Sequence, residues 1–204
     1  MWYVYRRFCE NSQLQVKKLP LTPLHYLIAY LIHKCDERLS LPGLVVGCMQ
    51  PDVETPIIFF LTRDSVHSRL ILHSLTGAAT LGTMLSLVLT ALIYPRLISR
   101  LFSFSVNDVK MKCRISYQLV LSCFLGNLSH VLLDLVNHEY NPLFWPFLPA
   151  ENTFNPICPL LGGYNSAGLI VGTFMLIITA SIIVYLHKHH DFHTLGFWKR
   201  ILVG

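Results

Sequence analysis

The sequence predicts an all-α, polytopic membrane protein folded as one helical bundle. The 204-residue chain is 53% hydrophobic and only 13% charged, and its mean hydropathy is +0.50. Soluble domains carry about a quarter charged residues, so this composition argues against a soluble domain. Two runs also lack Lys, Arg, Asp and Glu over the roughly 20 residues that a helix needs to cross a bilayer.

The N-terminal third is apolar in shorter pieces. Residues 1–20 are basic and aromatic, and we expect them at the membrane interface. Thr22–His33 and Leu41–Met49 are each too short to span alone, so we expect a half-span, re-entrant helices or helices of the bundle core. Pro51 and Pro56 then interrupt the apolar pattern.

Three later segments are long enough to span. Leu72–Tyr94 has 23 residues and Ala167–Leu186 has 20, and neither contains Lys, Arg, Asp or Glu. Ile115–Val136 is equally long and carries one His and one Asp. We therefore expect three full spans within a membrane helical domain of residues 21–186, followed by a basic cytoplasmic tail of residues 187–204.

The distribution of basic residues predicts an orientation. Lys and Arg are concentrated between Pro95 and Arg114 and in the tail, so both segments are expected in the cytoplasm. The connection from Asn137 to Asn165 has neither residue and is expected on the extracytoplasmic side of the cell's inner membrane, although the basic N-terminal segment opposes this orientation. The net charge of +5 is explained by basic residues beside spans, so we expect no nucleic-acid partner.

His130, Asp134 and His138 stand four residues apart in an apolar segment. Residues at this spacing lie on one face of a helix, so His130 and Asp134 point the same way, while His138 is more peripheral. Burying an imidazole and a carboxylate in a membrane is costly unless something compensates them. A metal ion compensates both, so the pair predicts one wall of a metal site.

Four further ionisable residues lie in similarly apolar surroundings: His25, Asp52, Glu54 and His73. A single buried histidine is more often a hydrogen-bonded core residue than a ligand. Three segments that supply His or Asp at one depth nevertheless favour a metal centre. Glu54 is a general base, a partner that orients a ligand histidine, or an exposed residue of a proline-bounded loop.

Four stretches occur in order between Thr22 and Phe147: TPLHYLIAYL, GLVVGCMQPDVE, HSLTG and SHVLLDLVNHEYNPLFWPF. Together they resemble the motifs of the membrane-bound metal-dependent hydrolases, which include LexA-regulated inner-membrane proteins and archaeal relatives. That family is similar to the all-α zinc-dependent phospholipase C and P1 nuclease group. The chain departs from the family pattern around His67 and His138. The resemblance implies one to three divalent ions, zinc above all, with five ligands: His25, Asp52, His73, His130 and Asp134.

The resemblance and the ligand types together imply a membrane-embedded, metal-dependent hydrolase of phospholipase or phosphatase type. Zinc lowers the pKa of coordinated water towards 7, which suits attack on a phosphoester or related bond of a lipid or lipid-linked substrate. Glu54 and His138 are the candidate catalytic residues. Two alternatives remain, namely a metal-binding protein without catalysis and a structural membrane protein whose polar residues only join helices.

Two segments keep more than one interpretation. Asn141–Pro149, NPLFWPFLP, is an interfacial aromatic belt or a lip past which an acyl or isoprenoid chain enters, and base rates favour the belt. His187–His193, HKHHDFH, offers metal ligands, but its place beyond the last span favours a solvated juxtamembrane segment.

Overall fold

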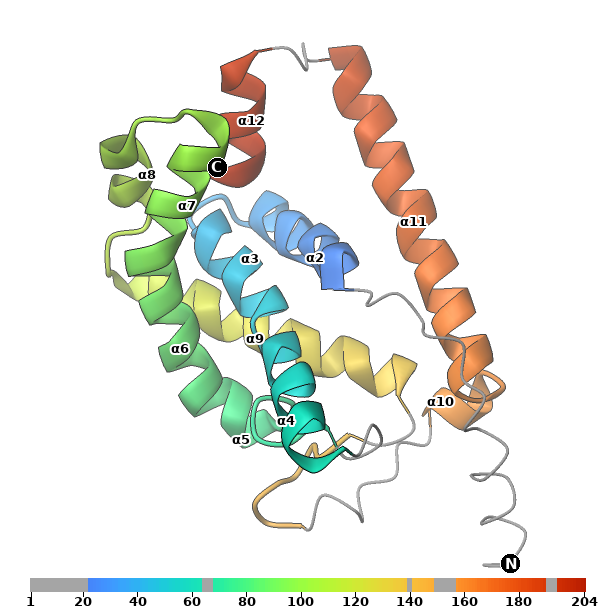
Figure 1. Cartoon of the computed structure of the whole chain (residues 1–204). Coiled ribbons are helices and arrows are strands. Elements are labelled where there is room, and N and C mark those ends of the chain that lie inside the picture. Colours follow the sequence, from blue (N-terminus) through green and yellow to red (C-terminus); the bar gives the residue numbers. More distant parts are fainter. Residues whose placement is uncertain (1–21, 64–67, 139–140, 149–156, 190–193) are drawn as a thin grey trace, which may run out of the picture.

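A computed structural model describes residues 22–63, 68–138, 141–148, 157–189 and 194–204, and these contain helices and no strand (Figure 1). The all-α prediction is therefore confirmed. In chain order the helices, including one 3-10 helix (η2) and two π-helical segments (η3 and η4), are α2 (Thr22–Cys35), α3 (Leu41–Met49), η2 (Pro51–Val53), α4 (Glu54–Thr62), α5 (Leu75–Gly77), η3 (Ala78–Gly82), α6 (Thr83–Val88), η4 (Leu89–Ile93), α7 (Tyr94–Phe102), α8 (Val106–Lys112), α9 (Tyr117–Asn137), α10 (Ile157–Leu160), α11 (Gly163–His189) and α12 (Leu195–Leu202).

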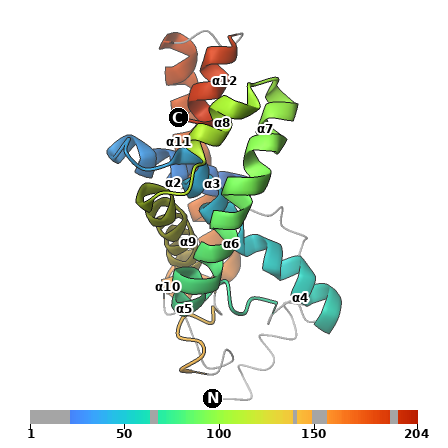
Figure 2. The same ribbon diagram turned by 90° about the vertical axis from the view of Figure 1, so that its left-hand side faces the viewer.

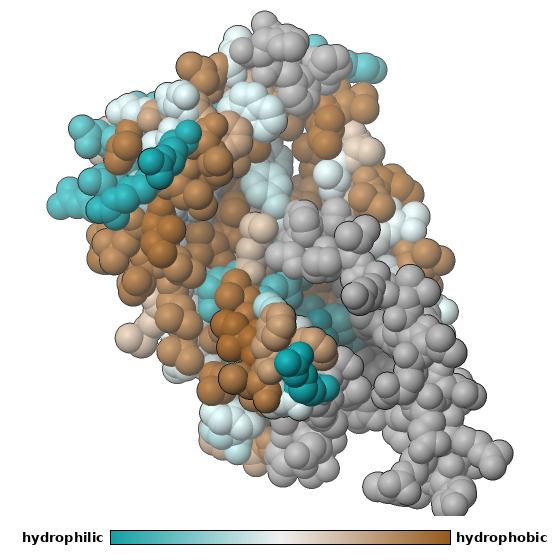
Figure 3. Space-filling view, viewed as in Figure 1, coloured by the Kyte–Doolittle hydropathy of each residue, from teal (hydrophilic) through white to brown (hydrophobic). Residues whose placement is uncertain are grey.

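Four helical runs in the described part of the chain are long and apolar enough to cross a membrane: Leu41–Thr62, Leu75–Phe102, Tyr117–Val136 and Ser166–Leu186. The last three correspond to the predicted spans. Apolar side chains cover the outer faces of α6 and α11, as contact with lipid requires (Figure 3). The helical composition and these four runs support a membrane protein.

The first of these runs differs from the sequence prediction. Pro51 and Pro56 do not separate its helices, because Pro51 opens η2 and Pro56 lies in the first turn of α4. Backbone N–H groups in a first turn have no intrahelical acceptor, so proline loses nothing there. α3, η2 and α4 thus form one run of 22 residues, and α4 projects from the helical body (Figure 2).

α3 and α9 form the centre of the fold, between α6–α7 and α11 (Figure 1). Their backbones touch at glycines: a Cβ on Gly47 would lie 2.6 Å from the Cys123 carbonyl oxygen, and one on Gly126 would lie 2.6 Å from that of Leu44. Small residues permit this approach between membrane helices. The contact fixes the C-terminal end of α3 against the part of α9 that carries His130.

The segment 187–204, expected as a basic cytoplasmic tail, ends in a helix. Its last part forms α12, which folds back towards α2 and α7. The Tyr26 hydroxyl donates to the Ile201 carbonyl at 2.7 Å and the Tyr94 hydroxyl donates to the Leu202 carbonyl at 2.6 Å. Phe197 is buried, so apolar contact and carbonyl capping together hold this end.

The two segments that were expected to share the cytoplasm lie together. α8 and α12 occupy the same end of the molecule, whereas α5 lies at the opposite end (Figures 1 and 2). Lys199 of α12 and Asp108 of α8 form an exposed ion pair at 2.7 Å. The basic residues of both segments therefore gather at one end.

Candidate metal centre

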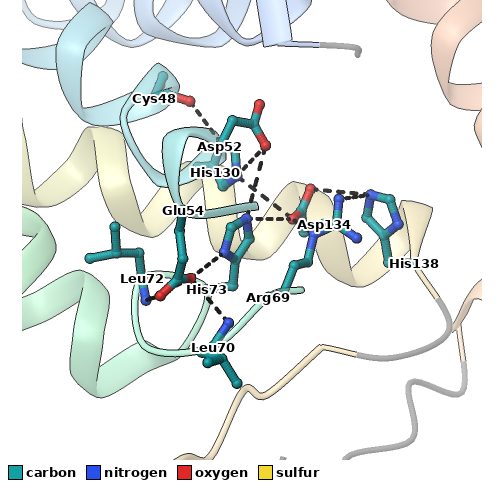
Figure 4. A network of polar contacts seen from close by, with 10 residues as sticks. All are labelled: Cys48, Asp52, Glu54, Arg69, Leu70, Leu72, His73, His130, Asp134 and His138. Atoms are coloured by element: carbon teal, nitrogen blue, oxygen red, sulfur yellow. Dashed lines mark hydrogen bonds and ion pairs between the residues drawn. The ribbon is translucent and has the colours of Figure 1, made fainter. Parts of the chain in front are cut away.

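Four polar side chains from three separate segments converge beside α9 (Figure 4). Asp52 comes from η2, His73 from the turn before α5, and His130 and Asp134 from α9. His130 Nε2 lies 3.6 Å from Asp52 Oδ1 and 3.6 Å from Asp134 Oδ2. His73 Nε2 lies 3.9 Å and 3.7 Å from the same two oxygens. The four atoms form a closed ring of alternating nitrogen and oxygen.

This ring has the dimensions of a metal site. Ligand atoms about 2.0–2.2 Å from a tetrahedral zinc ion lie roughly 3.3–3.5 Å from each other, slightly closer than here. Three of the four atoms are buried and make no hydrogen bond within the described structure, namely His73 Nε2, His130 Nε2 and Asp134 Oδ2. Buried polar atoms without a hydrogen bond are rare, and several that face one point are an arrangement that could hold a metal ion.

A backbone contact orients His130. Its Nδ1 lies 2.7 Å from the Cys48 carbonyl oxygen, which can only accept a hydrogen bond. Nδ1 therefore carries the proton, and in the neutral ring Nε2 keeps its lone pair. The glycine contact between α3 and α9 brings Cys48 to this position, so helix packing selects the tautomer that a metal ligand needs.

Glu54 orients His73 in the same way. Its carboxylate lies 3.0 Å from His73 Nδ1 and also accepts the backbone N–H groups of Leu70 and Leu72. A carboxylate that holds the far nitrogen of a histidine is a frequent partner of metal ligands. Of the roles considered for Glu54, the geometry favours the orienting partner, because its oxygens are already engaged.

His25 of α2 lies above His130. The two rings stack with centroids 4.3 Å apart, and His25, Asp52 and His130 each offer a ligand atom within 4.8 Å of the others. Burial, and then the neighbouring His130, lower the pKa of His25 to about 4. His25 is consequently neutral near pH 7 and could offer a lone pair to a metal ion.

The carboxylates give the centre an affinity for positive charge. Burial alone would lower the pKa of His73, but the acceptor oxygens of Asp52 and Glu54 outweigh burial and raise it. The same negative potential that favours a proton on this imidazole favours a metal ion in its place.

Arg69 and His138 lie on the side of Asp134 away from His73 (Figure 4). Arg69 Nε is 3.4 Å from Asp134 Oδ2, and Arg69 Nη2 donates to His138 Nε2 at 2.8 Å. Burial, and then Arg69, lower the pKa of His138 to about 3, so the ring is neutral and able to accept. His138, expected as a catalytic residue, thus presents Nε2 to Arg69.

Arg69 is the residue that the sequence analysis missed. It precedes His73 by four positions in the apolar stretch RLILHSLTG. An arginine beside an apolar run needs a partner, and this could have flagged it. Its partners come from α9, more than 60 residues away in sequence, and no local spacing rule connects them.

The aromatic segment that follows α9 is tied to the turn carrying His73. The backbone N–H of Leu75 donates to the Leu143 carbonyl at 3.0 Å, and the Thr76 hydroxyl contacts the Trp145 carbonyl. Both interpretations of this segment stay open. His67, and residues 190–193 of the histidine-rich segment, lie outside the described residues.

The chain matches the model of a known protein family. The family model described as a domain of unknown function, DUF4184, matches residues 19–194. The chain belongs to this family. The DUF4184 match spans all the converging residues, Arg69 included. No curated protein and no solved structure matches the chain.

Proposed function

We propose that this DUF4184 protein is a membrane-embedded, metal-dependent hydrolase that cleaves a phosphoester or related bond of a lipid or lipid-linked substrate. One observation supports it above the rest: His73 Nε2, His130 Nε2 and Asp134 Oδ2 are buried, make no hydrogen bond within the described structure and are directed at one point beside Asp52. Structural networks usually satisfy buried polar atoms with hydrogen bonds, so three such atoms together favour a site that binds a ligand.

Zinc suits the ligand set best. Two imidazole nitrogens and two carboxylate oxygens at near-tetrahedral spacing are a donor set that zinc accepts. When bound, a divalent ion supplies Lewis acidity and lowers the pKa of coordinated water towards neutrality. Glu54 and the Cys48 carbonyl would hold the two histidines in the required orientation.

The approach to the centre favours a lipid. Asp52 is the most accessible of the four ligands, with its side chain 21% exposed against 0–3% for the others, so the open side lies at η2. α4 begins two residues later and exposes Ile57, Phe60 and Leu61. A substrate that reaches Asp52 therefore passes an apolar helix, which suits an acyl or isoprenoid chain.

The proposal also includes an orientation of the protein in the membrane. Basic residues gather on α8 and α12, and the turn that carries His73 lies beside α5 at the other end (Figure 1). By the positive-inside rule the basic end faces the cytoplasm, and the metal centre is then close to the extracytoplasmic face of the inner membrane.

A second candidate function is metal binding without catalysis. It is favoured by the number of ligands: four protein donors close a tetrahedral site, and His25 adds a fifth, whereas catalytic zinc sites keep one position open. The two functions predict the same metal content and differ in turnover.

Metal content and turnover should be measured together on the purified full chain in detergent micelles. We expect stoichiometric zinc by plasma mass spectrometry and zinc-dependent cleavage of bis(4-nitrophenyl) phosphate or of phospholipid in mixed micelles. Asp134→Asn removes a ligand charge and should lower both by at least about 10-fold. Asp108→Asn, in an exposed ion pair, is the matched control and should leave both unchanged.

The outcomes separate the hypotheses. Zinc that is lost in Asp134→Asn, without turnover on either substrate, supports the binding protein and rejects the hydrolase. A wild-type chain that takes up no zinc, cobalt or manganese after reconstitution rejects both.

A further inference from the structure

Arg69 contacts the two side chains, Asp134 and His138, that could hold a second ion beside the first. In two-metal sites a carboxylate bridges two ions about 3.5–4 Å apart, and further side chains complete the outer ion. Here Asp134 directs Oδ2 to His73 and His130 on one side, while Arg69 Nε lies 3.4 Å from the same oxygen. His138, which would complete an outer ion, accepts from Arg69 instead.

His130 limits the number of ions that can bind between His25, Asp52, His73 and Asp134. Within the described residues, two groups of side chains could hold a metal, His25–Asp52–His130 and His73–His130–Asp134, and both require the same histidine. Because Nδ1 of His130 is hydrogen-bonded to the Cys48 carbonyl, only Nε2 can ligate. One imidazole nitrogen binds one ion, so the two groups describe a single position.

The formal charges of the side chains in the cluster also favour one divalent ion. Asp52, Glu54 and Asp134 contribute three negative charges as carboxylates, and Arg69 contributes one positive charge at any physiological pH. The four histidines of the cluster are neutral as ligands or acceptors, namely His25, His73, His130 and His138. One divalent ion therefore brings the buried cluster to neutrality, and a second would leave it two charges positive in a low-dielectric environment, which is costly.

We propose that the centre holds one divalent ion and that Arg69 is its fixed second cation, bridging Asp134 and His138 in place of a second metal. This rests on the proposed metal centre and narrows the one to three ions that the family resemblance implies. It also assigns His138 to the support of Arg69, outside the ligands of the ion.

The first test is the stoichiometry of the full chain. The histidine-rich segment His187–His193 offers further imidazole ligands for zinc, so its histidines should first be replaced by Asn. We expect one zinc per chain after dialysis, by plasma mass spectrometry and by titration against a chromophoric chelator. Two ions per chain would overturn this inference and leave the metal centre standing, whereas no ion would overturn the centre itself.

The second test removes the fixed cation. In the same background, Arg69→Ala exposes Asp134 and His138, and we expect a second, weaker zinc equivalent at saturation. Arg69→Lys keeps a positive charge and should stay at one, and Arg69→Ala combined with His138→Ala should return to one. A stoichiometry of one for Arg69→Ala at saturating zinc contradicts the proposed role of Arg69.

If Arg69→Ala does not fold, the His138→Ala variant by itself tests the proposal. Because His138 is assigned outside the ligands, we expect the single zinc to be retained with its affinity changed less than about 10-fold, the lower end of the usual loss for partners of a ligand. Loss of the ion from a folded His138→Ala chain would make His138 a ligand and reject the proposal.

Discussion

At the scale of single residues, the centre depends on which nitrogen of each histidine is left available. His130 and His73 each engage Nδ1, with the Cys48 carbonyl and with Glu54, and each directs Nε2 to the same point. The local spacing of His130 and Asp134 on one helix predicts that they share a face, and the structure brings them to 3.6 Å. No local pattern gives the partners that set the tautomers.

Glu54→Gln tests the orienting role of this carboxylate. The amide has one acceptor oxygen for three donors and no charge to hold the His73 imidazole, so we expect zinc affinity to fall by about 10–100-fold while the fold is retained. Competition with a chelator measures the affinity, and circular dichroism checks helix content.

Glu37→Gln is the control for this substitution, because Glu37 pairs with Lys34 on an exposed surface. Unchanged zinc affinity in Glu54→Gln would mean that His73 is oriented without the carboxylate, and the role assigned to Glu54 would be wrong.

At the scale of elements, the contact between α3 and α9 positions residues of the candidate metal centre. The glycines of LPGLVVGCM leave no side chain between the two backbones, and this places the Cys48 carbonyl against His130. Hydropathy alone identifies both segments as apolar, but it does not show which faces meet. The continuous run from Leu41 to Thr62 likewise depends on where its prolines fall within their turns.

Gly126→Ala tests this contact. The added methyl group would lie 2.6 Å from the Leu44 carbonyl oxygen, so the helices must separate. We expect a loss of roughly 1–3 kcal/mol in stability, together with weaker zinc binding as the Cys48 carbonyl moves. Thermal unfolding in detergent and zinc titration measure the two effects.

Gly196→Ala on α12 is the matched control, because nothing lies within 4 Å of its added Cβ. There the alanine should be neutral or stabilise by up to about 1 kcal/mol. If Gly126→Ala unfolds at the wild-type temperature, the backbones do not meet as closely as described.

At the scale of the whole molecule, one end contributes packing that stabilises the fold, and the other end contributes a candidate metal ligand. α12 closes one end through Phe197 and through carbonyls held by Tyr26 and Tyr94, while His73 lies in the turn before α5 at the other (Figure 1). Stability and metal binding should therefore separate under mutation.

Phe197→Ala tests that separation. It removes a side chain that is 5% exposed, and we expect a loss of about 3–5 kcal/mol with the zinc stoichiometry of the folded protein unchanged. Trp198→Ala, at a neighbouring residue that is 38% exposed, should cost clearly less. Equal losses in the two variants would show that α12 is not docked through Phe197.

The membrane assignment is also tested on the whole chain. Four apolar helical runs of 20–28 residues should keep the protein in the membrane pellet after an alkaline carbonate wash. Release into the supernatant would show that the runs do not span, and the apolar faces of α6 and α11 would then need another partner.

The sequence by itself determined the helical membrane character and the chemical types of the proposed ligands. Both follow from local properties, namely long uncharged runs and ionisable residues within them. Only the tertiary structure decided that Glu54 orients His73, that Arg69 joins the centre and that His138 faces Arg69. These contacts join residues far apart in the chain, and the close glycine contact between α3 and α9 places η2, which follows α3, beside the part of α9 that carries His130.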